Sequence, residues 1–163
     1  MDFIVKLLKS KDLVTDLPYD SILVIVNRLT KYLHFIPCNE TIAAKQLGYL
    51  VIDRLVRNHR LLTTFITDRD KLFTSNYWKT LVTAIGIKHK LSIAFHPQTD
   101  GQTKRINQSL EAYLRHYINY TQDNWVLLLL MAQIALNNNA SEVTRVTPFY
   151  ANFRKHLNLF IEP

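Results

Sequence analysis

Cysteine, glycine and long apolar runs are scarce or missing in this sequence of 163 residues. The single cysteine, Cys38, cannot form an internal disulfide, and the clustered Cys/His ligands of a structural zinc site are absent, which favours an intracellular, reducing compartment. The longest apolar stretch, Trp125 to Ala132, is too short to cross a bilayer. The N-terminal segment mixes charges too early for a signal peptide. Transmembrane, collagenous and disordered classes are therefore excluded.

The composition indicates one basic globular domain. Apolar residues make up 48% of the chain, enough for a sizeable core, and no repeat or Gly/Ser linker divides it, so we expect a single domain over residues 1–163. Twenty Lys and Arg against thirteen Asp and Glu give a net charge of +7, which indicates a polyanionic partner, although many basic domains bind nothing in particular. Glycine occurs three times, where average usage would give about eleven.

Hydrophobic periodicity predicts an α/β fold. We expect strands at 2–8, 21–26, 33–37, 63–67 and 87–94, and helices at 41–58, 74–85, from 100 or 102 to 120, and 125–137. The run SILVIV at 21–26 suits a strand buried on both faces. Residues 9–20 are predicted to form a turn and residues 95–103 an irregular segment. Three strands followed by alternating helices and strands predict a mixed five-stranded sheet flanked by helices, the ribonuclease H-like layout.

Two aspartates occupy positions of chemical interest. Asp2 and Asp68 lie in or at the end of predicted strands, each flanked by apolar residues. Carboxylates that finish central strands can converge on one edge of the sheet, and phosphoryl-transfer enzymes use such a cluster to hold two divalent ions about 4 Å apart. From the residues alone, an ordinary strand-end or turn aspartate is the simpler interpretation of both.

Five segments resemble the integrase catalytic core of gypsy-type LTR retrotransposons. They are MDFIVKLLKS, YDSILVIVNRLTKYLHFIPC, FITDRDKLFTSNYWKTL, HPQTDGQTKRINQSLEAYLRHYI and TPFYANF, and from the first to the last they span residues 1–153, almost the whole chain. The resemblance implies a ribonuclease H-like fold and metal-dependent 3′-processing and strand transfer of element DNA into the genome. It also implies Mg²⁺ or Mn²⁺ as cofactor, element ends and target DNA as partners, self-association and a nuclear location, with no membrane and no small-molecule substrate.

The family active site consists of two aspartates and a glutamate, with 35 residues between the second aspartate and the glutamate. The resemblance assigns Asp2 and Asp68 as catalytic residues and metal ligands, and it places Lys104 at the glutamate, because the family pattern GQTERVN reads GQTKRIN here. An ammonium repels Mg²⁺ and cannot coordinate it unless deprotonated, so we expect poor metal binding and an inactive chain. Glu111 cannot substitute, because it lies about 10.5 Å further along the helix axis.

Nucleic-acid contacts are expected to survive the loss of one ligand, because phosphate binding depends on summed positive charge. The candidates around the predicted active edge are Lys88, Lys90, His96, Gln98, Gln102, Lys104 and Arg105. An ordinary solvated face is the alternative. His89 and His96 also suggest a metal site, but no third ligand stands at motif spacing.

Other departures from the family pattern suggest a decayed element copy. Asn27 replaces an aspartate, Arg60, Asp70 and Arg145 replace glycines, Leu62 and Leu130 replace prolines, and Gln133 replaces a glutamate. Except for Gln133, which needs a transversion, each change can arise from a single transition in a codon. Where a family glycine adopts positive φ, its replacement costs about 1–3 kcal/mol, so we expect a weakened fold.

The resemblance leaves the biological role open. Family integrases carry an N-terminal zinc-binding domain and a C-terminal DNA-binding segment, which are absent from these 163 residues, and the core itself looks truncated at its N-terminal edge. The alternative to an integrase core acting in DNA integration is a catalytically silent nucleic-acid-binding relic or an adopted host protein. A third hypothesis is a translated gene fragment without a role.

Overall fold

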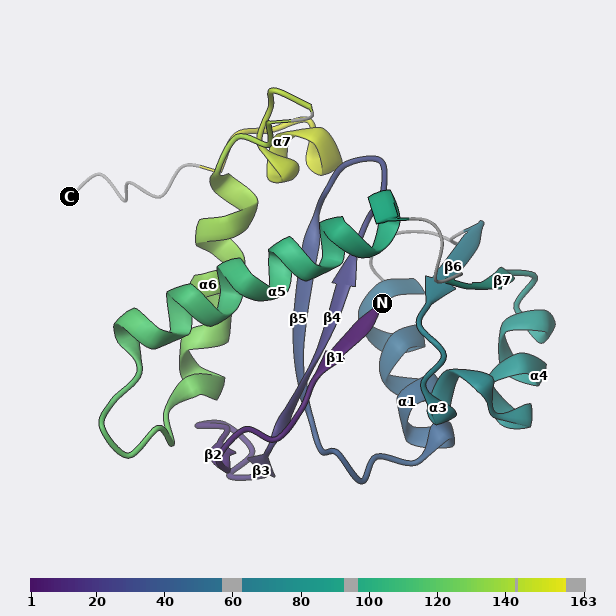
Figure 1. Ribbon diagram of the computed structural model, residues 1–163, viewed down its shortest axis with the longest axis horizontal. Helices are drawn as coiled ribbons and strands as arrows, with labels where there is room; N and C mark the ends of the chain where they lie inside the picture. The colour runs from purple at the N-terminus through teal and green to yellow at the C-terminus, as the bar shows by residue number, and fades with distance from the viewer. Residues whose placement is uncertain (57–62, 93–96, 143, 158–163) are drawn as a thin grey trace.

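The computed structural model describes residues 1–56, 63–92, 97–142 and 144–157, without the side chains of residues 97–103. A three-stranded antiparallel sheet has the order β1-β4-β5, a two-stranded parallel sheet joins β6 and β7, and β2 pairs with β3 in a small hairpin (Figure 1). The strands are β1 Asp2–Ile4, β2 Ser10–Lys11, β3 Pro18–Tyr19, β4 Ser21–Val26, β5 Leu33–Cys38, β6 Thr64–Thr67 and β7 Lys88–Leu91. The helices are α1 Ala44–Val51, continued by the π-helical segment η1 Ile52–Val56, then α3 Lys71–Thr74, α4 Asn76–Ala84, α5 Pro97–Tyr117, α6 Trp125–Asn138 and α7 Pro148–Phe153.

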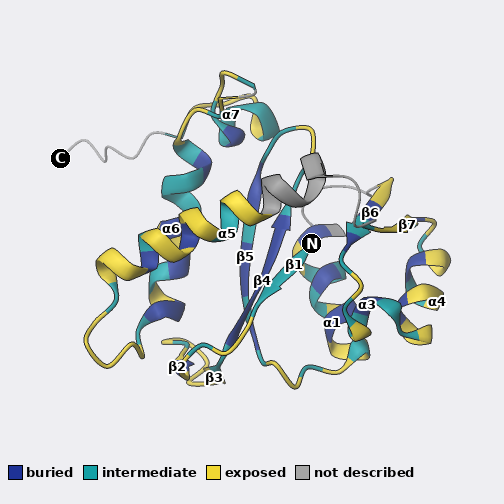
Figure 2. Ribbon diagram, in the orientation of Figure 1, coloured by how far each residue is buried: buried dark blue, intermediate teal, exposed yellow. Residues whose placement is uncertain are grey.

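Helices cover both faces of the three-stranded sheet. Along β4, Leu23 and Ile25 face the core cluster that contains α1, α3 and α4, whereas Ile22 and Val24 face the cluster that contains α5 and α6. Figure 2 shows β4 buried along its length between these layers. The prediction that SILVIV forms a strand buried on both faces is confirmed. None of the helices in the described residues has the length and apolar character that a membrane span needs.

The predicted five-stranded sheet is not formed in the described part of the chain. The five expected strands are present, but they divide into the β1-β4-β5 sheet and the β6-β7 pair. Strand β1 ends at Ile4 instead of position 8, and Lys6 adopts a positive φ of 63° that breaks the extended run. Among the described residues, the backbone link between β1 and β6 is one hydrogen bond, from the Met1 nitrogen to the Ile66 oxygen (2.8 Å). A single bond is not a strand ladder, so the fold class is confirmed only as mixed α/β.

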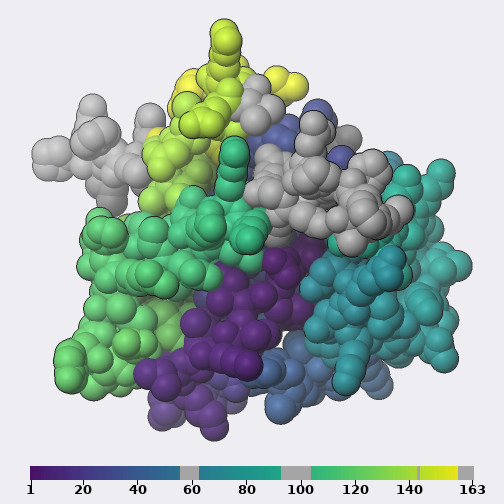
Figure 3. All heavy atoms as spheres, viewed as in Figure 1, coloured from purple at the N-terminus to yellow at the C-terminus, as the bar shows by residue number. Residues whose placement is uncertain are grey.

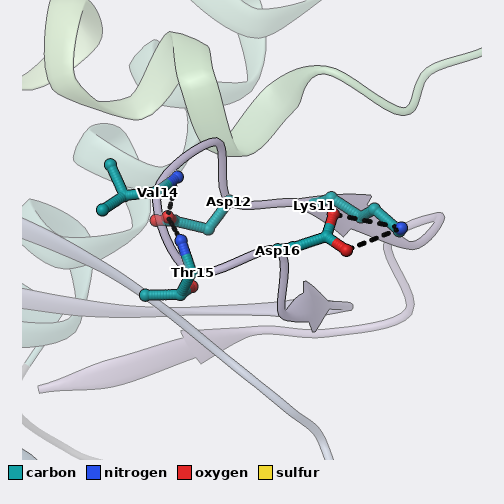
Figure 4. Close-up of polar contacts among 5 residues, drawn as sticks. All are labelled: Lys11, Asp12, Val14, Thr15 and Asp16. Carbon is teal, nitrogen blue, oxygen red and sulfur yellow. Dashed lines mark hydrogen bonds and ion pairs between the residues drawn. The ribbon is translucent and has the colours of Figure 1, made fainter.

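The hairpin β2-β3 occupies the segment that was predicted to be a turn. The Asp12 carboxylate accepts hydrogen bonds from the backbone N–H groups of Val14 and Thr15, and Lys11 pairs with Asp16 at 3.1 Å (Figure 4). Its base is anchored to α6, because the buried Ser10 hydroxyl accepts a hydrogen bond from the Val126 N–H. The hairpin is therefore fixed to the helical layer.

Several helix boundaries differ from the sequence prediction. Helix α5 begins at Pro97, inside the segment predicted to be irregular, because proline is well tolerated in the first turn of a helix. The helix expected at 74–85 is α4, which begins at Asn76, because Ser75 is extended and caps α4 by accepting from the Trp78 N–H, while Thr74 ends the preceding helix α3. The apolar stripe of α5 predicts that Leu110, Leu114 and Tyr117 belong to the core. Leu110 and Leu114 are buried, but Tyr117 is 61% exposed, so the prediction is wrong for Tyr117. Tyr117 lies in the last turn of α5, where its ring packs on Tyr113 instead of on the sheet.

The outer edge of β5 is covered by polar side chains of α6. The Gln133 amide oxygen accepts a hydrogen bond from the Phe35 N–H (2.8 Å). Asn137 accepts from the Leu33 N–H (2.8 Å) and donates to the Leu33 carbonyl (2.9 Å). A glutamine in place of the family glutamate therefore still supplies the acceptor that this edge needs, because only one side-chain oxygen is used.

The departures from the family pattern differ in their structural effects. The side-chain oxygen of Asn27 accepts hydrogen bonds from the backbone N–H groups of Leu29 and Thr30, as an aspartate oxygen would. Asp70 has an ordinary φ of −56° and caps α3 by accepting from the Leu72 N–H, so the expected strain at this position is absent. Arg145 adopts φ 55°, as expected for a position that favours glycine. Arg60 and Leu62 lie outside the described residues.

Arg145→Gly and Arg154→Gly are each expected to stabilise the protein. Arg154 ends α7 in the left-handed conformation (φ 60°), which glycine adopts without the cost to other L-residues of about 1–2 kcal/mol. Part of this gain is offset because glycine loses more backbone entropy on folding, leaving a net gain of up to about 1 kcal/mol per site, or roughly 2–4 °C in Tm. Thermal melts would measure it. Lys79→Gly, in the middle of α4, is the control and should destabilise; a lower Tm for both arginine variants would contradict the strain argument.

Candidate active site

Strands β1 and β6 bring the two predicted aspartates to one end of the sheets. Asp2 opens β1, and Asp68 directly follows the last residue of β6. The two strands meet through the bond from Met1 to Ile66, and the charge of Asp2 acts on the Asp68 carboxyl. Asp2 and Asp68 therefore lie at the same edge, as their positions in or at the end of the predicted strands indicated.

Burial raises the pKa of Asp68. This carboxyl is half-buried, and the negative charges of Asp2 and Asp70 raise its pKa further, while a hydrogen bond from the Asp70 N–H (3.3 Å) acts in the opposite direction. Crowding of carboxylates that raises a pKa is characteristic of sites that bind cations or protons.

The backbone at Asp68 is held by a hydrogen-bonded pair behind it. The Thr67 hydroxyl, 1% exposed, donates to the Asp68 carbonyl oxygen (2.9 Å) and lies 3.0 Å from the His89 Nε2. Because a hydroxyl has one proton, His89 Nε2 is the donor to Thr67 when the Thr67 proton is directed to the Asp68 carbonyl. Burial and then the charge of Lys79 lower the pKa of His89. His89 therefore supports β6, while His96, the other half of the suggested histidine site, lies outside the described residues.

Helix α5 places Asn107 beside Asp2. The Asn107 amide nitrogen donates to one oxygen of Asp2 (2.9 Å), and the other oxygen accepts from the Phe3 N–H (2.9 Å). Lys104 precedes Asn107 by three residues, which puts both on the same face of the helix, and its side chain is exposed. Sequence reasoning missed Asn107, because its bond to Asp2 joins residues 105 positions apart and no local pattern marks it.

Comparison with known proteins identifies the family. No family model matches the chain. The Tf2-3 and Tf2-4 transposon polyproteins of Schizosaccharomyces pombe are each 33% identical to it over 144 residues, or 86% of this chain. The chain belongs to the integrase catalytic-core family of LTR retrotransposons and retroviruses. It spans 11% of the length of these polyproteins.

Solved retroviral structures share the fold of this integrase core. The catalytic core domain of BIV integrase matches with a TM-score of 0.66 at 19% identity, covering 94% of this chain and 92% of that one. The HTLV-2 integrase core matches with a TM-score of 0.64 at 14% identity, covering 93% and 95%. A chain of the simian T-cell lymphotropic virus intasome gives a TM-score of 0.71 at 15% identity, covering 99% and 57%. These neighbours assign a ribonuclease H-like fold.

The described residues of this integrase core do not fit a pair of divalent ions. Both oxygens of Asp2 accept hydrogen bonds from the protein, and Lys104, which the resemblance aligns with the third family carboxylate, supplies an ammonium. Within the described ranges, no three His, Cys, Asp or Glu side chains form a group that could hold a metal ion. The roles of Asp2 and Asp68 as metal ligands therefore stay predictions.

The predicted nucleic-acid contacts are only partly described. Lys88 and Lys90 are exposed on β7, and Lys104 and Arg105 are exposed on α5. Gln98 and Gln102 belong to α5, but their side chains are outside the description, as is His96. The cations that are described therefore point to solvent, as phosphate contacts require.

Asp68→Asn is expected to raise the Tm of the integrase core at neutral pH. Since burial raises the pKa of Asp68, the native state binds its proton more tightly than the unfolded state does. Ionisation therefore costs stability as the pH rises from the unfolded pKa through the folded pKa, and the cost persists at neutral pH. Thermal melts in EDTA at neutral pH and near pH 3 would measure the difference, which should vanish at the lower pH.

Asp123→Asn provides a control of opposite sign. Hydrogen bonds from Asn119 and Thr121 lower the pKa of Asp123, so its ionised form favours the folded state at neutral pH. The asparagine variant should therefore show no gain in Tm. An Asp68→Asn variant that melts below the parent at neutral pH would contradict the prediction that the ionised Asp68 destabilises the fold.

Proposed function

We propose that this chain is an integrase core that binds element and target DNA but does not catalyse strand transfer. The observation that carries the proposal is Lys104, which lies one helical turn from the residue bonded to Asp2, at the position of the family glutamate. An ammonium there opposes a divalent ion but attracts a phosphate. The same substitution thus removes turnover and adds a DNA contact.

The surrounding charge supports DNA binding. The chain carries a net charge of +7, and Lys88, Lys90, Lys104 and Arg105 are all exposed on the elements next to the aspartates. Family resemblance adds Mg²⁺ or Mn²⁺ as the cofactor of active members, the nucleus as the place of action and self-association. The HTLV-2 core was solved in complex with magnesium in a trimeric form, which supports metal use and self-association in the family. The simian virus intasome also supports self-association.

The decayed-copy hypothesis belongs to the same proposal. Arg145 at positive φ supports the loss of a glycine, and the lysine at position 104 is one transition away from glutamate. Comparison of the coding DNA with sister copies tests it. Transversions as frequent as transitions would contradict a transition-biased process.

DNA binding by the chain should depend on salt and not on divalent ions. Each phosphate contact contributes a slope of about −0.9 to log K against log salt, so Lys88→Gln together with Lys90→Gln should reduce the slope by up to about 1.8. Fluorescence anisotropy with a labelled duplex, in EDTA and in Mg²⁺, would measure the binding, and gel analysis of the same duplex would detect cleavage. Cleavage by the parent chain in Mg²⁺ would disprove the catalytic silence, and binding without salt dependence would disprove the DNA interface.

A further inference from the structure

A second cationic surface lies at the end of α7, away from the aspartates in the sequence. Arg28 and Lys31 belong to the connection between β4 and β5, and Arg154 and Lys155 follow α7. The two segments are joined: the Thr30 hydroxyl bonds to the Asn152 side-chain oxygen at 3.4 Å, and the rings of Tyr32, Phe149 and Phe153 pack together at centroid distances of 4.9–6.4 Å. Figure 1 shows α7 beside this connection, toward the end of the molecule where α5 begins. We call Arg28, Lys31, Arg154 and Lys155 the α7 cationic surface.

The α7 cationic surface is held in a fixed shape. The Arg154 N–H bonds to the Tyr150 carbonyl (2.8 Å), and the ring of His156 stacks on that of Tyr150 at 4.6 Å. The Lys31 ammonium donates to the Arg28 carbonyl (2.6 Å). Figure 3 shows the residues around α7 protruding from the molecule at this end. The backbone that carries these cations is therefore ordered before any ligand binds, which lowers the entropy cost of binding.

Three of the four cations of this surface, those other than Lys31, point to solvent. Arg28, Arg154 and Lys155 are exposed, and none of the three forms an ion pair with a carboxylate in the part of the chain that the structure describes. Like charges held close together repel one another, and a polyanion that lies across them removes this repulsion. Several fixed, exposed cations on two adjoining segments match a row of phosphates better than a single small anion.

We propose that the α7 cationic surface binds the phosphate backbone of duplex DNA, as a second contact beyond the active-site edge. The inference rests on the proposed function, because it extends the DNA interface of the same integrase core. It assigns to Arg28, Arg154 and Lys155 a positioning role for DNA.

The test compares two variants that lose equal charge. The triple variant Arg28→Ala, Arg154→Gly, Lys155→Ala removes the α7 cationic surface, and the glycine relieves the positive φ at position 154. The control, Lys9→Ala, Lys45→Ala, Lys79→Ala, removes three exposed cations from other elements. Duplex binding by anisotropy should be about tenfold weaker for the first variant than for the control at the same salt, with a salt slope reduced by about 0.9 per lost contact. Equal affinities of the two variants would overturn the inference.

Lysine acetylation of the unaltered chain gives a second readout. Duplex DNA should protect Lys155 from acetylation, measured by mass spectrometry, and leave Lys45 reactive; equal reactivity of Lys155 with and without DNA would overturn the inference. Tighter binding of an acidic peptide than of duplex DNA to the parent chain would also overturn it. Failure of the parent chain to bind DNA at all would disprove the proposed function, whereas normal parent binding with an unaffected triple variant disproves only the α7 contact.

Discussion

Lys104→Glu is expected to produce Mg²⁺-dependent strand transfer in a chain that otherwise shows none. The position lies one turn from Asn107, whose amide bonds to Asp2, so it is on the same face of helix α5 as a residue that contacts the first aspartate. The variant replaces a repelling ammonium with a third carboxylate. Residues that merely orient metal ligands are worth about 10–100-fold, so we expect a gain of at least about 100-fold over the parent. Transfer on branched or end-mimicking DNA would measure it.

Three further variants separate the possible causes of a gain. Lys104→Gln removes the repulsion without adding a ligand, and Arg105→Glu makes the same charge change one residue along α5; both should remain inactive. Asp68→Asn combined with Lys104→Glu should abolish the recovered activity. If Lys104→Glu is inactive while it folds and binds DNA, changes elsewhere in the chain have also destroyed the site.

The strands were predictable because their signal is local. Strands β4, β5, β6 and β7 all fall within the expected ranges to within a few residues. Strands β4, β5 and β6 are mostly apolar or β-branched, whereas β7, with the sequence KHKL, is the polar part of the expected range 87–94. The absence of a ladder between β1 and β6 was not predictable, because it depends on where β1 stops. That end is determined by the positive φ at Lys6 and by the anchoring of the following hairpin to α6 through Ser10.

The difference between local signals and contacts made by tertiary packing also explains which residues of the candidate site were predicted. Asp2 and Asp68 could be placed at one edge because strand ends and the family pattern both indicated it. Asn107 could not be found, since its bond to Asp2 joins residues 105 positions apart, and only the packing of α5 brings them together. Residues 97–103, at the start of α5, were predicted to be irregular for another reason. Their composition is typical of a turn, yet they form a helix that starts at a proline.

Asn137→Leu is expected to be among the most destabilising substitutions in the protein. Asn137 is 1% exposed and satisfies both the N–H and the carbonyl of Leu33 on the outer edge of β5. Leucine has a similar size but leaves both buried backbone groups without a partner. Each unsatisfied group costs about 1–3 kcal/mol, so we expect a loss of about 2–5 kcal/mol. Urea denaturation would show it as a lower midpoint with an unchanged m value.

Asn138→Leu is the matched control for this effect. Asn138 is the next residue of α6, is partly exposed, and makes no side-chain hydrogen bond within the described ranges, so its replacement should change stability by less than about 1 kcal/mol. The difference between the two variants isolates the two bonds to Leu33 from the general effect of adding an apolar residue to this helix. Because β5 is the outer strand of the β1-β4-β5 sheet, loss of these bonds exposes an edge next to the central strand β4. Equal midpoints for the two variants would show that water or a shifted β5 satisfies Leu33 instead.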